Sequence, residues 1–171
     1  MHFLPCLSLS LLLVSSAAAQ TDTLPQPVTP VILTVGGHIA HFNTDTSDRR
    51  EARLDQTLLD TLPRRTLITS TVVTDGSRTF EGFLMRDLLN RLEAQGSTVA
   101  ATALNDYVIR IPFDDFYRYD VLVADTMDGR RLTPRDKGPL WIVYPRDTHD
   151  ELQDIRYDYR WVWQLHRLEI Q

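Results

Sequence analysis

The sequence contains very little cysteine and lysine, and both scarcities limit its chemistry. Its 171 residues include one cysteine, Cys6, and one lysine, Lys137. One thiol cannot form a disulfide within the chain, nor can it supply the several thiolates of a structural metal site. The 18 basic residues are spread among 23 acidic ones, and the formal net charge is −5. Because no continuous basic stripe exists to hold a phosphate backbone, we expect no nucleic-acid partner.

Long hydrophobic runs are also missing. The apolar run at 7–14 is far shorter than the ~20 residues of a membrane-spanning helix, and the small residues Ala17, Ala18 and Ala19 follow it. This pattern predicts a secretory signal peptide over 1–19. The mature protein would then be exported and not embedded in a membrane. It would contain no thiol, because Cys6 lies in the leader.

The sequence gives little support for a serine hydrolase or for a histidine metal site. No serine lies in the G-x-S-x-G pattern of a hydrolase nucleophile. His38 and His41 are three residues apart in a predicted strand or turn, where their side chains would diverge instead of converging on a metal ion. Asp114 and Asp115 could form an acid–base pair, but adjacent acids at this place are more typical of a helix start.

Composition predicts one globular domain. The chain is 43% hydrophobic and 24% charged, as ordinary folded domains are. Residues 20–30 contain Pro25 and Pro27 among polar residues, which predicts an extended arm. The domain proper is predicted over 31–171.

Hydrophobic spacing predicts two helices among many strands. The first helix is predicted to begin at a capping box of Asp48 and Glu51 and to end at Pro63. The second is predicted over 84–92, with Gly96 as its C-cap. The leucines of the first helix, Leu54, Leu58, Leu59 and Leu62, would form its buried stripe.

β-branched and aromatic runs predict the strands. Asp75-Gly76 and Asp128-Gly129 are typical hairpin turns. The predicted strands are 31–35, 66–73, 99–104, 107–111, 121–124, 140–144 and 161–170. Together with the two helices they indicate the α+β class.

Aromatic residues are concentrated in the second half of the chain. Eleven of the 15 lie between Tyr107 and Trp163, interleaved with arginine and aspartate. Such a surface suits a flat heteroaromatic ligand, whose ring stacks on an aromatic side chain while charged groups bind its edge. The alternative is that these rings fill a β-rich core.

The chain contains an ordered series of short motifs. They are Leu62-Pro63, FEGFLMRDLL at 80–89, Asn105-Asp106-Tyr107, Ile111-Pro112, DGRRL at 128–132 and KGPLWIVYP at 137–145. This series resembles the molybdopterin-binding domain of the sulfite oxidase type. The similarity covers about 31–170 and is strongest to short, secreted, stand-alone bacterial members. It implies a single mixed-sheet α+β domain.

The chain departs from this family at three places. In catalytic members a cysteine thiolate ligates molybdenum in the segment after the first helix, but here that segment, 66–78, contains no cysteine. Trp141 stands where those relatives usually have an arginine, and Val162 stands where they tend to have a lysine. The resemblance therefore implies that the protein ligates no metal. It favours a small uncharged pterin over the phosphorylated molybdopterin cofactor.

The predicted pterin site combines stacking and edge-binding residues. A pterin edge carries donors beside an oxo acceptor, which a carboxylate and an arginine can bind together. Tyr107 and Lys137 belong to the predicted set. The stacking candidates are Trp141, Tyr144 and Trp163, and the edge candidates are Asp106, Asp115, Arg146 and Asp147.

The resemblance also implies a role. Some short secreted relatives resemble pterin-responsive regulators that dock on the periplasmic part of a membrane signalling protein. We therefore expect a periplasmic, pterin-binding, non-catalytic domain with such a partner. One alternative is a molybdopterin-dependent oxidoreductase of the sulfite oxidase type. Another is a structural module whose former cofactor pocket is filled by Trp141 and its neighbours.

Overall fold

The computed structural model describes residues 23–46 and 49–171, so the predicted signal peptide lies outside the described residues. The α+β class is confirmed. No helix in the described ranges is long and apolar enough to cross a membrane. In chain order the elements are β1 (Leu33–Gly37), β2 (Thr44–Thr46), β3 (Arg49–Leu54), α1 (Gln56–Leu59), β4 (Arg64–Ser70), β5 (Ser77–Leu84), α2 (Met85–Arg91), β6 (Thr98–Ala103), β7 (Val108–Pro112), α3 (Asp115–Arg118), β8 (Leu122–Met127), β9 (Arg130–Arg131), β10 (Trp141–Val143), the 3₁₀ turns η1 (Arg146–Thr148) and η2 (Asp150–Gln153), α4 (Ile155–Asp158) and β11 (Leu165–Ile170).

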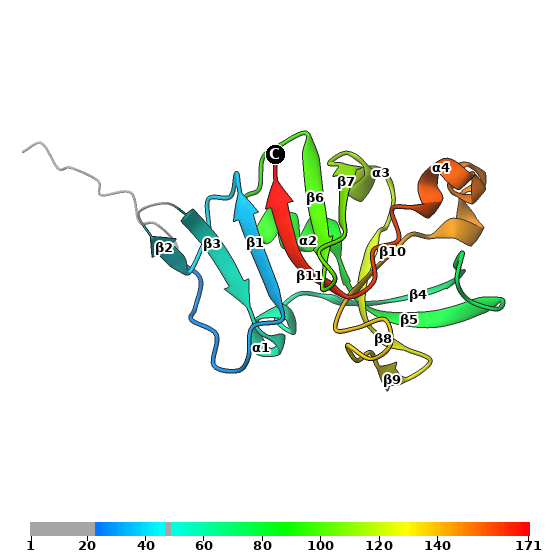
Figure 1. Cartoon of the computed structure of the whole chain (residues 1–171), viewed down its shortest axis with the longest axis horizontal. Helices are drawn as coiled ribbons and strands as arrows, with labels where there is room; N and C mark the ends of the chain where they lie inside the picture. Colours follow the sequence, from blue (N-terminus) through cyan, green and yellow to red (C-terminus); the bar gives the residue numbers. More distant parts are fainter. Residues whose placement is uncertain (1–22, 47–48) are drawn as a thin grey trace, which may run out of the picture.

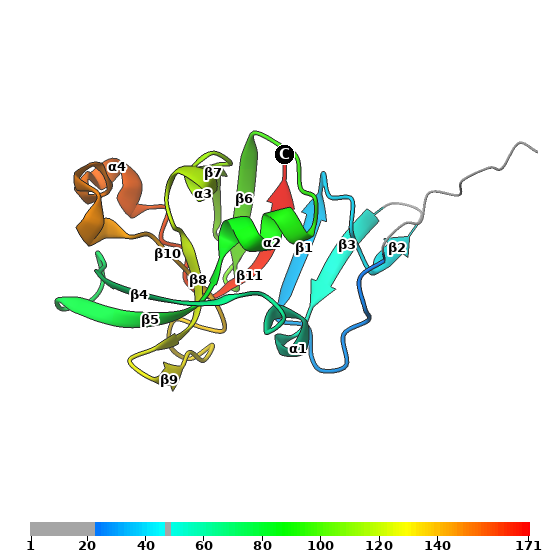
Figure 2. The ribbon, with the colours of Figure 1, turned by 180° about the vertical axis from the view of Figure 1, so that it is seen from behind.

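The first sheet has six strands in the order β2-β3-β1-β11-β6-β7. β1 and β11 run parallel, and the other neighbours are antiparallel. Side chains alternate between the two faces, so Leu33 and Val35 enter the core while Thr34 points away from it. α2 lies behind this sheet in Figure 1 and in front of it in Figure 2. One face of the sheet is therefore covered and the other is open.

The second sheet has the order β10-β8-β5-β4, with β9 paired to β8. Its central strand β8 is buried along almost its whole length, as the apolar run at 121–124 predicts. β4 and β5 form a long hairpin that extends away from the first sheet, toward the side where α4 lies (Figure 1). The two sheets share a core that includes Phe80, Leu89 and Leu168.

The predicted hairpin turn at Asp128-Gly129 is confirmed. Both residues have positive φ, 49° and 73°, which is the type I′ geometry that fits the right-handed twist of paired strands. The predicted helix over 84–92 is confirmed as α2. The predicted strands correspond to observed ones with shifted ends. The largest shift is in the last strand, which begins at Leu165 because Gln164 has φ 54°.

The helix predicted from the capping box is wrong over 49–54, which forms strand β3. Ala52 and Leu54 are buried and Arg53 is exposed, a period of two, and β3 pairs with β1. Asp48, the predicted cap, lies outside the described residues. Glutamate and arginine favour helices locally, but pairing with β1 overrides that preference. The helix that does form, α1, is only one turn long.

The true N-cap of α1 is Asp55, which also holds the extended arm. Its Oδ1 accepts from the Leu58 amide at 2.9 Å, and its Oδ2 accepts from the Val28 and Thr29 amides at 2.8 Å each. These bonds, led by that of Leu58, lower the pKa of Asp55 from 3.8 to about 2.

The prediction that Gly96 caps α2 is also wrong. The residue with left-handed backbone after α2 is Glu93, with φ 46°. Gly96 is required for a different reason, because a Cβ there would lie 2.5 Å from the Gln171 carbonyl oxygen. The glycine allows the loop before β6 to pass close to the end of β11.

Candidate functional site

The nine predicted site residues fall into separate groups in the structure. Arg146 and Asp147 lie at the tip of the β4–β5 hairpin, and Asp115 contacts Tyr144 in the interior. A third group gathers around Trp163. Its members are Lys137, Trp141 and Trp163, while Asp106 and Tyr107 form the turn between β6 and β7.

Asp147 is bound by the segment in which catalytic relatives have their cysteine. Its Oδ2 accepts from the Ser70 amide at 2.7 Å and from the Ser77 hydroxyl at 2.9 Å, and its Oδ1 accepts from the Ser70 hydroxyl. The Asp147 amide in turn donates to the Thr69 hydroxyl at 3.2 Å. These bonds, led by that of the Ser70 hydroxyl, lower the pKa of Asp147 below its usual value. Asp147 is an exposed anion ringed by hydroxyl groups.

Strand register explains why these residues meet. Ser70 and Ser77 are directly opposite each other at the end of the β4–β5 hairpin, so their side chains share one face. Pro145, two residues after the end of β10, is the N-cap of η1, which carries Arg146 and Asp147 across the hairpin tip. One terminal nitrogen of Arg146 lies 3.4 Å from the Ser70 hydroxyl. Its Nε is buried and has no hydrogen-bond partner among the described residues.

The aromatic group around Trp163 is only partly accessible. Trp141 is fully buried and packs edge-on against Phe80 and Trp163, with ring centroids 5.3 and 6.5 Å apart. Trp163 is 36% exposed, and the Lys137 ammonium lies 4.6 Å from the centre of its ring. Trp163 therefore offers the open ring of this group, whereas Trp141 supports it from the core.

The turn between β6 and β7 lies near this aromatic group. The Leu104 amide donates to the Gln164 carbonyl, and the Gln164 amide donates to the Lys137 carbonyl. Asp106 adopts φ 64°, and Tyr107 is 55% exposed. Backbone hydrogen bonds thus join the turn to the loop that carries Lys137.

Asp115 and Tyr144 form a buried polar cluster. The Tyr144 hydroxyl donates to Asp115 Oδ2 at 2.8 Å, and Arg160 forms an ion pair with the same oxygen. Burial, reinforced by the adjacent Asp115 carboxylate, raises the pKa of Tyr144 well above its usual value. Asp114 holds the N-cap position of α3 but its side chain makes no capping bond. The helix-start interpretation thus describes the position of the two acids and not the bonds that they make.

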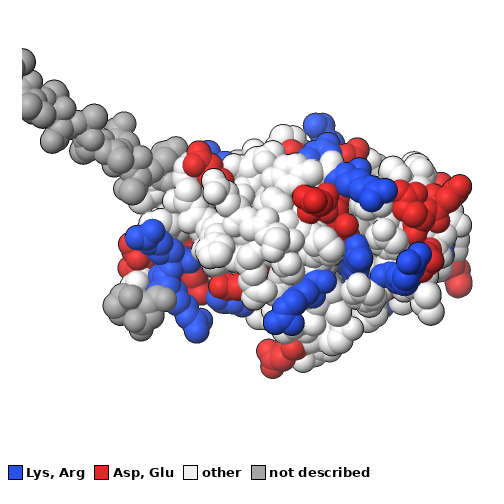
Figure 3. All heavy atoms as spheres, turned by 90° about the horizontal axis from the view of Figure 1, so that it is seen from above, with Lys and Arg blue, Asp and Glu red and all other residues white. Residues whose placement is uncertain are grey.

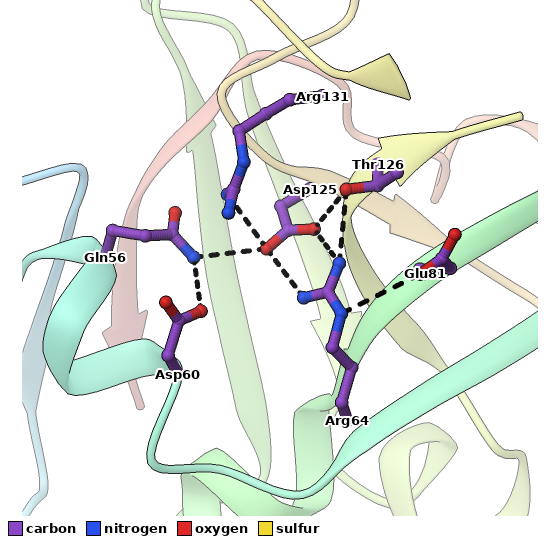
Figure 4. A network of polar contacts seen from close by, with 7 residues as sticks. All are labelled: Gln56, Asp60, Arg64, Glu81, Asp125, Thr126 and Arg131. Carbon is purple, nitrogen blue, oxygen red and sulfur yellow. Dashed lines mark hydrogen bonds and ion pairs between the residues drawn. The ribbon is translucent and has the colours of Figure 1, made fainter. Parts of the chain in front are cut away.

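A second acidic network escaped the sequence predictions. Asp125 of β8 is 2% exposed and receives bonds from Arg64 at 2.7 and 3.0 Å and from Arg131 at 3.2 Å (Figure 4). Gln56 and Thr126 complete its shell at 3.2 and 2.8 Å. Burial opposes its ionisation, but the bonds led by Arg64 outweigh burial, so the pKa of Asp125 lies below its usual value. In the sequence, this network was indicated only by a single acidic residue, Asp125, within the apolar run VLVADTM at 121–127.

Three cavities lie away from the nine predicted positions. An apolar groove of about 680 Å³ separates the N-terminal arm from α1 and α2, and Leu24, Leu58 and Leu62 line it. A polar cavity of about 340 Å³ lies beside Asp125. A third, of about 640 Å³, lies on the open face of the first sheet.

The described residues carry mixed surface charge and no grouped metal ligands. Basic and acidic side chains lie interspersed on the face shown in Figure 3. Within the described ranges no three His, Cys, Asp or Glu side chains are grouped to hold a metal ion. His41 lies 3.5 Å from Glu93 through its Nε2.

Comparison with known proteins relates these features to a family. Residues 60–149 match the family model described as "Oxidoreductase molybdopterin binding domain". The crystal structure of the sulfane dehydrogenase SoxCD from Paracoccus pantotrophus is similar in fold, with a TM-score of 0.58 and 17% identity over 81% of this chain. This chain spans 37% of the length of that one. A search of curated proteins found no match.

Proposed function

The chain belongs to the oxidoreductase molybdopterin-binding domain family, and from that premise we propose that it is a periplasmic, pterin-binding, non-catalytic member that regulates a membrane signalling protein. Family membership agrees with the motifs quoted above and with the α+β fold. Export rests on the leader pattern over 1–19. The absence of catalysis rests on the donor chemistry of the site.

The residues present do not fit a molybdenum centre held by the protein. Segment 66–78 contains no cysteine, and the side chains that it turns toward Asp147 are the hydroxyls of Ser70 and Ser77. A neutral hydroxyl is a far weaker metal ligand than a thiolate, and these hydroxyls already donate to a carboxylate. We therefore derive no reaction step through a metal at this site.

The observation that carries the proposal is the arrangement of Arg146 and Asp147. A carboxylate and a guanidinium stand next to each other at the exposed hairpin tip, and the buried Nε of Arg146 has no acceptor among the described residues. The N–H groups and the oxo group of a pterin edge complement this pair. Because this Nε is buried, a ligand acceptor reaches it only when the Arg146 side chain turns outward, and the bond then satisfies a polar atom that otherwise costs free energy to bury.

The aromatic candidates differ in whether they can stack on a ligand. Trp141 and Tyr144 are fully buried, so neither offers a ring face to solvent. Their burial favours the alternative in which Trp141 fills part of the former cofactor pocket. Trp163 retains an exposed surface and is the remaining stacking candidate. The pterin proposal therefore depends on the Arg146–Asp147 edge more than on the tryptophans.

The family match also favours a second function, a molybdopterin-dependent oxidoreductase. The matched residues 60–149 include both the hydroxyl-bearing segment and the Arg146–Asp147 pair. A molybdopterin held by its pterin part alone would need no cysteine. This enzyme and the proposed regulator use the same edge contacts and differ in whether metal is retained.

The first experiment is ligand analysis of the mature protein purified from its native periplasm. The protein is denatured to release tightly held ligand, and the supernatant is assayed for pterin fluorescence and for molybdenum. One equivalent of pterin without molybdenum supports the proposal. One equivalent of molybdenum overturns it in favour of the oxidoreductase, and the absence of both overturns it in favour of the filled-pocket module.

Two variants locate the ligand. Asp147→Asn and Arg146→Gln should each lower the retained pterin about tenfold or more, because each removes one charged hydrogen-bonding partner of the ring edge. Asp75→Asn, in the exposed turn of the same hairpin, is the matched control and should retain the parental amount. Unchanged retention in both site variants would place the ligand elsewhere.

A further inference from the structure

The open face of the first sheet carries arginines on alternate strands. On β3, Ala52 and Leu54 are buried, so Arg49, Glu51 and Arg53 point to the opposite, open face. The same alternation places Arg167 of β11 and Arg110 of β7 on this face. No helix of the described part covers it, and it faces the viewer in Figure 1.

The strands between these arginines carry small, uncharged side chains. Thr34 of β1 lies opposite both Arg53 and Arg167, and Ala100 of β6 lies opposite Arg110. Gly36 and Thr102 complete the set. Small residues on β1 and β6 leave a hollow of about 640 Å³, lined by side chains that include those of Arg49, Arg110 and Arg167.

The hollow is basic although the chain is acidic. Arg167 is engaged by Glu51 at 2.9 Å and by Glu169 at 3.2 Å. Arg53 and Arg110 are exposed and form no side-chain ion pair among the described residues. The two glutamates are therefore neutralised within the sheet, while the outer arginines keep their charge for a partner.

We propose that this face docks an acidic, proline-rich segment of a partner protein in the polyproline II conformation. Neighbouring strands are about 4.8 Å apart, so Arg53 of β3 and Arg110 of β7, four strands apart, stand about 19 Å apart across the sheet. A polyproline II helix repeats every three residues, or about 9.3 Å, on one side. Two such repeats span about 19 Å, so acidic residues six positions apart would meet Arg53 and Arg110. Arg110 is displaced by two residues along its strand, an offset that its long side chain can span.

Fluorescence anisotropy with two labelled peptides of equal composition tests the proposal on the mature protein at low salt. One peptide repeats Glu-Pro-Pro four times, and the other has four consecutive glutamates flanked by four prolines on each side. The periodic peptide should bind roughly fivefold more tightly, because only its spacing matches the arginines, and added salt should weaken it. Equal affinities would overturn the proposal.

A double variant with a matched control completes the test. Arg53→Gln with Arg110→Gln should weaken binding of the periodic peptide roughly fivefold, whereas Arg65→Gln with Arg130→Gln removes the same charge from the second sheet and should leave it unchanged. An equal loss of peptide affinity in both double variants would overturn the proposal. A salt-sensitive dimer that the first double variant abolishes would also overturn it, because a second copy of the chain would then occupy the face. Thermal unfolding confirms that each variant folds. The outcome does not depend on the ligand of the Arg146–Asp147 pair.

Discussion

Asp125 and Asp147 are both held ionised, but by different means. Asp125 is buried in β8 and receives bonds from two arginines, a glutamine and a threonine (Figure 4). Asp147 is exposed at the hairpin tip and is bound mainly by the hydroxyls and amide of two serines. A saturated, buried carboxylate has no capacity left for a ligand, whereas an exposed one can exchange a hydroxyl for a ligand donor. The comparison separates a structural acid from a binding acid.

The largest expected effect is on stability, from Asp125→Asn. Removing this charge leaves Arg64 and Arg131 facing a neutral, buried amide. Their side chains are 45% and 52% exposed, so the loss is smaller than for a fully buried pair. We expect a loss of about 2–3 kcal/mol in the free energy of unfolding, measured by urea denaturation. The exposed Asp75→Asn is the control, and an equal loss there would contradict the structural role of Asp125.

A smaller loss is expected from Tyr144→Phe, which tests a second buried carboxylate. The change removes the hydrogen bond to Asp115 but leaves the ion pair with Arg160. We expect a loss of about 1–2 kcal/mol, because one buried acceptor loses one of its donors. Tyr107→Phe, on the exposed turn, should change stability little, and the same urea titration compares the two.

The pH dependence of stability tests the depressed pKa of Asp55. Its pKa is about 2 in the folded protein against a usual 3.8. A depressed folded pKa contributes stability that is fully present above 3.8 and is lost as the pH falls toward 2. Thermal unfolding between pH 5 and pH 2 should show this loss, and Asp55→Asn should flatten the curve. An unchanged slope in the variant would assign the acid sensitivity to other carboxylates.

The smallest effect on stability is expected from Asp147→Asn. The side chain is exposed and bonded to hydroxyls, so the free energy of unfolding should change by less than about 0.5 kcal/mol. Retained pterin should nevertheless fall, as proposed above. A stability loss as large as that of Asp125→Asn would remove the distinction between the two acids.

Local pattern was sufficient for several elements of the fold. The apolar face of α2 and the alternation in most strands depend on neighbours within a few residues, and both were predicted. Pattern failed at 49–54, where helix-favouring residues form a strand because β1 supplies a partner. It failed again at Gly96, whose requirement comes from Gln171, far along the chain.

The candidate site shows the same division. The residue types Arg146, Asp147, Trp141 and Trp163 were identified from composition and motif, but their environments were not. Burial of Trp141 and the link between Asp115 and Tyr144 depend on contacts across the core. Nothing near Asp125 in the sequence indicates Arg64 as its partner, which is 61 residues away.

The sequence by itself determined the fold class, the hairpin turn at Asp128-Gly129, the family and the lack of a thiolate in segment 66–78. These depend on local periodicity, on backbone preferences at single residues and on residue identity. Only the tertiary structure decided which acids are saturated and which are open, and that the serines of the hairpin reach Asp147, 70 and 77 residues away. The reason is physical: hydrogen bonds and burial act between side chains that the fold brings together, whatever their separation along the chain.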